Sequence, residues 1–168
     1  QAPIGYNPVP EMTFSLAAGL NWKGIDFSIL LQGAARSSIY LQQDIAWDNF
    51  WGNYYEEHIG RWTPETAATA TYPRFTKAAT AAHPNYYKSD YWLKDSKYLR
   101  LKNIQLGYTI PRKLLKKFGV RSLRVYANAY NLFTWDNVKK VDPESSNNSN
   151  GQFYPQQKVI NFGINLNF

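Results

Sequence analysis

The segment KVINFGINLNF, residues 158–168, alternates apolar and polar side chains over most of its length. Because successive side chains of a β-strand point to opposite faces, this alternation predicts a strand with one apolar and one amide-lined face. About ten such residues suit either a strand that crosses a bilayer in a barrel or a half-buried strand of a soluble β-sandwich. The segment alone favours neither. Its apolar face carries Ile160, Phe162, Ile164, Leu166 and Phe168.

Four other segments show the same alternation at a similar length. Between the first two, Lys23 and Gly24 suit a two-residue hairpin turn, because Gly readily adopts the positive φ that such turns require. Between the last two, residues 111–121 form a short basic connection with room for one helical turn, which Gly119 would close. The four segments are 12–22, 25–36, 98–110 and 122–133.

The apolar positions of segment 98–110 change phase within the strand. They are odd-numbered up to Leu101 and even-numbered from Ile104 onward. One extra residue in a β-bulge would return both halves to a single face of the sheet. We therefore predict a bulge at Lys102–Asn103.

The connections between the five strands alternate between short and long. The short ones are 23–24 and 111–121, and the long ones are 37–97 and 134–157. In an antiparallel meander the two long connections share one end of the sheet. Outer-membrane barrels have this asymmetry, with short periplasmic turns and long extracellular loops. The pattern favours a transmembrane barrel and places the C-terminus on the periplasmic side.

Five strands are too few to close a membrane barrel, since the smallest have eight, and open edges would expose backbone groups to lipid. We therefore expect the chain to be the C-terminal part of a longer protein. The N-terminal residues have no signal-peptide pattern, as expected for a mature chain or a fragment.

Composition agrees with an all-β membrane protein. Aromatic residues make up 17% of the 168 residues, whereas the mean hydropathy is only −0.50. A barrel combines these properties because half of its strand residues face a polar lumen. No apolar run reaches the 18 or so residues of a membrane helix, and cysteine is absent. The sequence thus excludes a helical membrane protein and a disulfide-stabilised domain.

The long connection 37–97 is rich in aromatic residues. The stretch 44–62 is compatible with one or two helical turns, opened by Asp44 as N-cap. A connection of this length is usually functional. Its aromatic side chains either form a small core of their own or face a substrate or partner. The candidates for the exposed role are Trp47, Trp51, Tyr54, Tyr55 and Trp62.

The sequence offers no catalytic constellation and no site for a metal or another cofactor. His58 and His83 lie in the long connection without ligand-like spacing. Asp142 and Glu144 match no standard Ca²⁺ loop, and we interpret 141–152 as a turn-rich loop. The basic residues of 111–121 suit anionic lipid headgroups at the barrel rim, since they lack the interleaved aromatics of a nucleic-acid platform.

The run YLRLKNIQLGYTIPRKLLKKFGVRSLRVYANAYNLFTW, residues 98–135, closely resembles the C-terminal signature of SusC/RagA-like TonB-dependent transporters of Bacteroidetes outer membranes. The motifs RWTPE (61–65), YPR (72–74), DP (142–143) and YPQ (154–156) and the terminal Phe168 belong to the same resemblance. It implies a barrel of about 22 strands with an N-terminal plug, in the bacterial outer membrane.

The resemblance also implies the partners of the whole protein. They are a SusD-like surface lipoprotein that acts as a lid, the remainder of the barrel and the plug, TonB, and outer-membrane lipid. The transporter would import large nutrients such as oligosaccharides or peptides with TonB-derived energy. Phe168 resembles the terminal aromatic by which the barrel-assembly machinery recognises its clients.

Two other classes of protein remain as alternatives. One is a soluble β-sandwich that binds carbohydrate through the aromatic residues. The other is a basic β-domain that binds nucleic acid. Both would be soluble, whereas a barrel segment would partition with the outer membrane.

Overall fold

The computed structural model describes residues 4–77, 83–138, 141–145 and 154–168, and the chain forms two compact units. The predicted polar loop 134–157 therefore lies partly outside the described residues. Among the described residues, no helix has the length and apolar character needed to cross a membrane. The sheet unit comprises Pro10–Arg36, Lys97–Asn137 and Gln156–Phe168, and the loop unit comprises Gln1–Val9, Ser37–Ser96 and Val138–Pro155.

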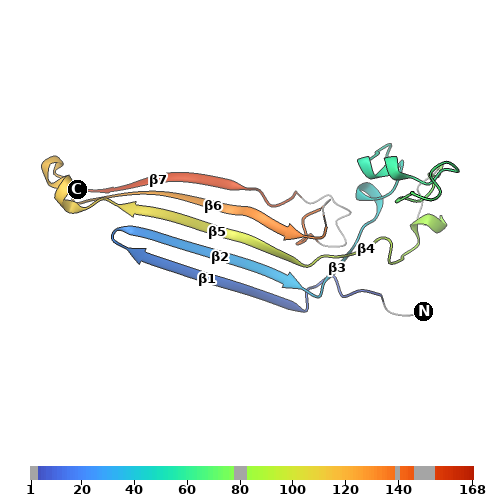
Figure 1. Cartoon of the computed structure of the whole chain (residues 1–168), viewed down its shortest axis with the longest axis horizontal. Helices are drawn as coiled ribbons and strands as arrows, with labels where there is room; N and C mark the ends of the chain where they lie inside the picture. The colour runs from blue at the N-terminus through green and yellow to red at the C-terminus, as the bar shows by residue number, and fades with distance from the viewer. Residues whose placement is uncertain (1–3, 78–82, 139–140, 146–153) are drawn as a thin grey trace. The chain divides into compact units, whose positions relative to one another are not determined.

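The sheet unit is one antiparallel sheet of five strands in the order β1-β2-β5-β6-β7 (Figure 1). Each strand therefore lies beside the next strand of the unit along the chain, as in the expected meander. The strand β6 extends three residues beyond its predicted end. The strands are β1 (Met12–Trp22), β2 (Ile25–Ala35), β5 (Tyr98–Thr109), β6 (Ser122–Asp136) and β7 (Val159–Asn167).

The register places the alternating apolar residues of all five strands on one face. A row across the sheet illustrates this, because Leu20 pairs with Phe27, and Phe27 pairs with Leu106. The row continues through Ala127 to Phe162. We call this surface the apolar face, and the opposite surface the polar face. Aromatic side chains occupy both ends of the apolar face: Trp22 and Tyr108 near the β1–β2 turn, and Phe14, Phe133 and Trp135 at the other end.

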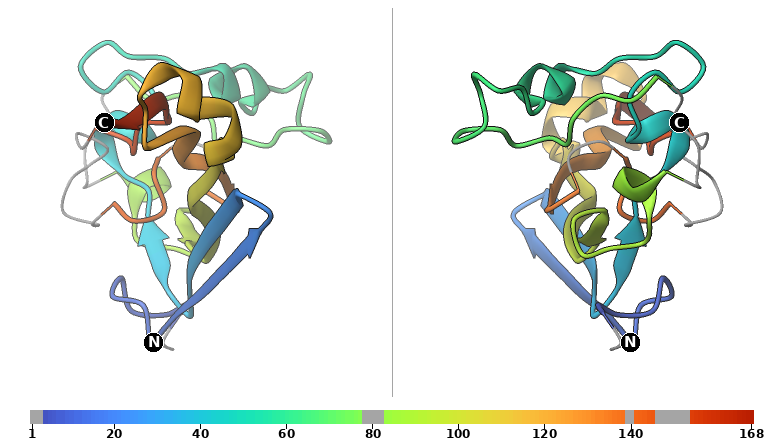
Figure 2. Two further views of the ribbon diagram at one scale, coloured as in Figure 1. Left: turned by 90° about the vertical axis from the view of Figure 1, so that its left-hand side faces the viewer. Right: turned by 90° about the vertical axis from the view of Figure 1, so that its right-hand side faces the viewer.

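The two short connections have the predicted forms. Lys23 and Gly24 have φ values of 48° and 88°, so both residues of the β1–β2 turn are left-handed, as a type I′ hairpin turn requires. Between β5 and β6 the chain makes one α-helical turn, α1 (Arg112–Leu115), followed by η4 (Lys116–Phe118). Gly119 then ends this helical segment with φ 69°; the segment is drawn in gold in Figure 2.

The predicted bulge in β5 is confirmed. Against β2, the register shifts so that Leu30 pairs with Asn103 while Leu31 pairs with Leu101. Lys102 is thus the extra residue. Against β6 the same level shows a second irregularity, because Leu101 pairs with Phe133 and Asn103 pairs with Tyr130.

Both long connections leave the sheet at one end, as the meander predicts. At that end Ala34 pairs with Tyr98, and Tyr98 pairs with Asp136, so β2, β5 and β6 are aligned there. Both short connections lie at the opposite end. The topology of the sheet thus shows that the long connections share one end and the short connections share the other.

The loop unit contains more regular structure than the sequence predicts. Two three-residue strands, β3 (Ser38–Tyr40) and β4 (Leu93–Asp95), pair antiparallel, although no strand was expected in 37–97. Three residues are too few to show an alternation. Short 3-10 helices are η1 (Gln43–Ile45), η2 (Glu56–Gly60) and η3 (Pro84–Tyr86).

The prediction that Asp44 caps the first helix is wrong. Asp44 lies inside the first turn of η1, and Gln42 takes the N-cap position without a capping side-chain bond. The helix begins at Gln43, two residues earlier than an N-cap at Asp44 would place its start, and the backbone of Gln43 is left-handed, with φ 51°.

Candidate functional site

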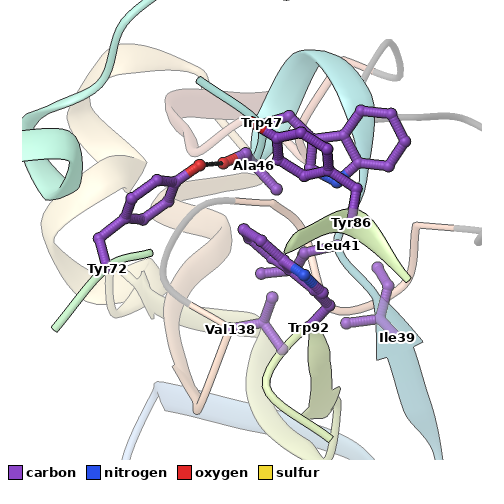
Figure 3. Close-up of a cluster of buried hydrophobic side chains, with 8 residues drawn as sticks. All are labelled: Ile39, Leu41, Ala46, Trp47, Tyr72, Tyr86, Trp92 and Val138. Carbon is purple, nitrogen blue, oxygen red and sulfur yellow. Dashed lines mark hydrogen bonds between the residues drawn. The ribbon is translucent and has the colours of Figure 1, made fainter. Parts of the chain in front are cut away.

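The loop unit has its own hydrophobic core, which is made mostly of aromatic side chains (Figure 3). Trp47 is central to it: its ring lies 4.7 Å from that of Tyr86 and 5.7 Å from that of Phe50, centroid to centroid. The buried members come from several segments of the unit, including β3 and η3. They are Ile39, Leu41, Ala46, Trp47, Tyr72, Tyr86, Trp92 and Val138.

Hydrogen bonds to the buried Asp48 hold two of these tyrosines. Asp48 Oδ1 accepts the hydroxyl of Tyr86, and Oδ2 accepts the backbone N–H of Thr76 at 3.0 Å. The Tyr72 hydroxyl donates to the Ala46 carbonyl at 2.8 Å and lies 3.4 Å from Asp48 Oδ1. Burial, together with the nearby Asp48 carboxylate, raises the pKa of Tyr72 and of Tyr86. Both rings are therefore neutral at physiological pH.

His58 is a structural residue of the same core. Its Nδ1 accepts the backbone N–H of Tyr55 at 3.0 Å, so Nε2 carries the proton and lies 3.2 Å from the Ala46 carbonyl. The side chain is buried among aromatic rings, the nearest being Tyr72 at 4.6 Å. Both ring nitrogens are thus engaged. Within the described parts of the chain, no three His, Cys, Asp or Glu residues are grouped to hold a metal ion.

The five aromatic candidates separate by burial. Trp47 is 3% exposed and belongs to the core, so its side chain does not offer a contact surface. The assignment of Trp47 to a substrate- or lid-facing role is therefore corrected. The other four, Trp51, Tyr54, Tyr55 and Trp62, are exposed.

Trp51 is the most exposed of the four, at 85%. It sits in a tight turn where Asn49, Trp51 and Gly52 all have positive φ, at 52°, 54° and 79°. A left-handed backbone is unfavourable for a bulky residue and marks positions worth a functional explanation. The indole is largely exposed, and its ring meets that of Phe50 edge to face at 6.0 Å, centroid to centroid.

Trp62 lines a hollow of about 360 Å³ in the loop unit. The walls carry two arginines and two aromatic rings, and the Arg61 guanidinium lies 5.0 Å from the centre of the Phe75 ring. Sequence reasoning missed this combination, although Arg61-Trp62 and Arg74-Phe75 repeat the same cation–aromatic pair 13 positions apart. The lining residues are Arg61, Trp62, Thr63, Pro64, Arg74 and Phe75.

The polar face of the sheet carries an ion pair that spans three strands. Arg124 on β6 contacts Asp26 on β2 through two nitrogens, Nε lying 2.9 Å from Oδ1. Gly107 on β5 lies between them, and a Cβ there would come within 2.5 Å of both side chains. The Arg124 guanidinium also lies over the Tyr126 ring, 4.8 Å from its centre.

Comparison with known proteins gives one consistent group of relatives, although no family model matches the chain. The chain is 29% identical to TonB-dependent receptor P26 of Formosa agariphila over 96% of its own length. It is 25% identical to TonB-dependent receptor SusC of Bacteroides thetaiotaomicron, again over 96% of the chain. The relatives are named as receptors, not as enzymes. The chain spans only 17% and 15% of their lengths.

Solved structures show the same fold. The structure of the RagAB peptide transporter matches 96% of the chain with a TM-score of 0.72, at 23% identity. The RagAB peptide importer in its 'open-open' state matches 97% with a TM-score of 0.71, at 21% identity. The chain covers 17% and 18% of those chains, respectively.

Proposed function

Because the chain is a SusC/RagA-like segment of a TonB-dependent receptor, an outer-membrane class of protein, we propose that its sheet is part of the wall of a nutrient-importing barrel. The apolar face lies against lipid and the polar face toward the lumen. Further strands of the same protein pair with the free edges of β1 and β7. The segment is the C-terminal part of a barrel of about 22 strands that encloses a plug.

The exposure of the apolar face carries this proposal. Phe162 and Ile164 in β7 are 82% and 69% exposed, and Leu16 and Leu20 in β1 are also exposed. A soluble sandwich would cover such a face with a second sheet. In a bilayer, lipid covers it, and the aromatic residues at its two ends fit the two girdles of a membrane barrel. The strands, of 9 to 15 residues, are long enough to span.

Spin labels on neighbouring residues of β7 test the orientation. We would replace Ile164 and Asn165 singly by Cys in the full-length receptor, free of other accessible cysteines, and reconstitute it in bilayers. We expect a label at 164 to be relaxed by lipid-soluble oxygen and a label at 165 by a water-soluble nickel complex. The opposite pattern, or equal accessibility at both positions, would refute the proposed placement.

The long connections lie outside the cell, and the C-terminus lies in the periplasm. We propose that the exposed aromatics of the loop unit, Trp51, Tyr54, Tyr55 and Trp62, contact the cargo or a SusD-like lipoprotein lid. Alanine replacement of all four would weaken lid binding or uptake of oligosaccharides or peptides. Unchanged lid affinity and uptake would contradict this role, and Lys77→Ala in the same connection is a suitable control.

Phe168 is exposed at the end of the chain, beyond β7. We propose that it is read by the barrel-assembly machinery. Its deletion would then slow assembly while leaving assembled receptors able to import. Import itself depends on TonB, which contacts a part of the receptor outside this segment. Assembly at the normal rate after deletion of Phe168 would count against the signal role.

A further inference from the structure

The hollow lined by Arg61 and Arg74 has the chemistry of an anion site. Both arginines line the same volume of about 360 Å³, which is within the range of small-ligand pockets. Among the residues that the structure describes, no carboxylate forms an ion pair with Arg61 or Arg74, whereas Arg36 pairs with Glu11 and Arg124 with Asp26. Two like charges that share a hollow without a counter-ion favour the binding of an anion.

The nearest acidic residue in sequence is turned to other partners. Glu65 lies just beyond the lining residues, and its carboxylate is hydrogen-bonded to Thr63 and to its own backbone, which lowers its pKa. The carboxylate is thus ionised, and its hydrogen bonds go to Thr63 and its own backbone and not to either arginine. Two arginines beside this one carboxylate leave a net positive charge around the hollow.

The backbone around the hollow is fixed before any ligand binds. Trp62 N–H donates to the Tyr72 carbonyl at 2.9 Å, and Tyr72 N–H donates to the Gly60 carbonyl at 3.0 Å. The Thr66 hydroxyl donates to the Arg61 carbonyl at 2.9 Å. On the other wall, the Asn85 side-chain amide donates to the Arg74 carbonyl at 2.8 Å. These bonds hold both arginine backbones in place.

The aromatic wall is equally well supported. The ring of Phe75 lies 5.6 Å from that of Tyr54 and 5.7 Å from that of His58, and the buried His58 is itself held by two hydrogen bonds. Arg61 packs on the Phe75 ring, so its guanidinium has a fixed platform. The indole of Trp62, 39% exposed, adds a second flat surface. A planar guanidinium beside flat rings suits a carboxylate attached to a ring or an apolar side chain.

We propose that this hollow binds the carboxylate-bearing unit of an imported nutrient. Two sources share this chemistry: the C-terminal residue of a short peptide and a uronate residue of an oligosaccharide. Arg61 and Arg74 bind the carboxylate, and Trp62 and Phe75 contact the body of the unit. The identification of the ligand as cargo rests on the import function proposed above, whereas the anion site rests on the loop unit alone.

Matched ligand pairs test the site. The full-length receptor, purified in detergent without a lid lipoprotein, is titrated calorimetrically with a short peptide and its C-terminal amide, and with a uronic-acid oligosaccharide and its neutral counterpart. We expect one acid to bind tighter than its neutral partner by about 10- to 100-fold. The pair that shows this difference identifies the source of the carboxylate.

Variants then assign the difference to the arginines. Arg61→Gln and Arg74→Gln should each remove most of the preference for the acid while leaving affinity for the neutral partner unchanged. Lys77→Gln removes a positive charge from an exposed residue outside the hollow and should leave the preference intact. A preference that survives both arginine variants overturns the proposal. Equal loss for acid and neutral partner also overturns it, because the arginines would then maintain the fold and not bind the carboxylate.

Uptake by cells separates this proposal from the import function. If the acid is imported at the wild-type rate by both arginine variants, the hollow is not its binding site and the import function stands. If the wild-type receptor binds the acid with the expected preference but no nutrient is imported, the import function fails and the anion site stands.

Discussion

Replacement of Asp48 by Ala tests whether the hydrogen bonds that converge on this carboxylate hold the loop unit together. Asp48 is 1% exposed and accepts from the Thr76 N–H and the Tyr86 hydroxyl. A hydrogen bond to a charged group contributes about 1.5–3 kcal/mol. The Tyr86 hydroxyl retains Thr76 Oγ1, 3.1 Å away, as a second partner. Only the bond from the Thr76 N–H is therefore lost outright, and we expect a local loss of about 2–3 kcal/mol.

Hydrogen exchange measured by mass spectrometry on the full-length receptor reports this loss locally. A change of 1.36 kcal/mol corresponds to a factor of ten, so amides in residues 44–62 should exchange about 30- to 150-fold faster in the Asp48→Ala variant. Asp48→Asn keeps one oxygen acceptor without the charge and should lie between wild type and Ala. The exposed Asp90 is a matched control, and Asp90→Ala should leave exchange unchanged.

Two results would refute the reasoning. Exchange in 44–62 that equals wild type would mean that the Asp48 hydrogen bonds do not stabilise the unit. Exchange that accelerates equally in β1 and in 44–62 would mean that the two units lose structure together. The second result would contradict the independent core of the loop unit.

Three further predictions concern the buried tyrosine, the polar face and the two tryptophans. Burial and then the bond to Asp48 raise the pKa of Tyr86, so the stabilisation by its neutral hydroxyl is complete below about pH 10 and is lost as the pH rises further. Protection of the loop unit from exchange, relative to the base-catalysed intrinsic rate, should therefore fall above about pH 10, and less so in Tyr86→Phe. Gly107→Ala should separate the ion pair that crosses it, so that the coupling between Asp26 and Arg124, measured by a double-mutant cycle in thermal unfolding, falls toward zero. Trp47→Ala should destabilise the loop unit by about 3–5 kcal/mol, whereas Trp51→Ala should change its stability by less than about 0.5 kcal/mol in the same exchange assay.

The two strand irregularities show what alternation reveals and what it hides. The β5 bulge adds one residue, Lys102, and so shifts the apolar positions from odd to even, which the sequence displays directly. In β6, two residues, Asn131 and Leu132, face that single residue. Two residues leave the parity unchanged, and the apolar positions remain odd from Leu123 to Trp135. The sequence therefore predicts the first irregularity but gives no sign of the second.

Asn131 shows why the second irregularity forms. Its φ of 51° is left-handed, a conformation that Asn tolerates better than most residues. Its side-chain amide donates to the Gln157 carbonyl at 3.1 Å, just before β7 begins at Val159. The bond joins β6 to the chain that leads into β7. This partner is distant in sequence, so no local pattern predicts the bond.

The loop unit was only half predictable for a related reason. The abundance of aromatic residues predicts that some pack together and others face outward, but it does not distinguish Trp47 from Trp51. The two tryptophans differ in backbone conformation, since Trp51 lies in a left-handed turn and Trp47 does not. They also differ in their long-range contacts, because Trp47 belongs to the same core as Tyr72 and Tyr86, which lie 25 and 39 positions further along the chain. Such contacts have no local sequence signal.

The alternation of apolar and polar residues predicts which glycines lie on the polar face, but it does not predict why glycine is needed there. Asp26, Gly107, Tyr126 and Gly163 form one row across β2, β5, β6 and β7. A Cβ at Gly107 would collide with the ion pair of Asp26, and a Cβ at Gly163 would lie 2.3 Å from the Tyr126 ring. Each glycine thus leaves room for a large polar or aromatic side chain of a neighbouring strand. Side chains that reach across strands cover this part of the polar face, so Gly107 and Gly163 are required by those neighbours and not by their own backbone.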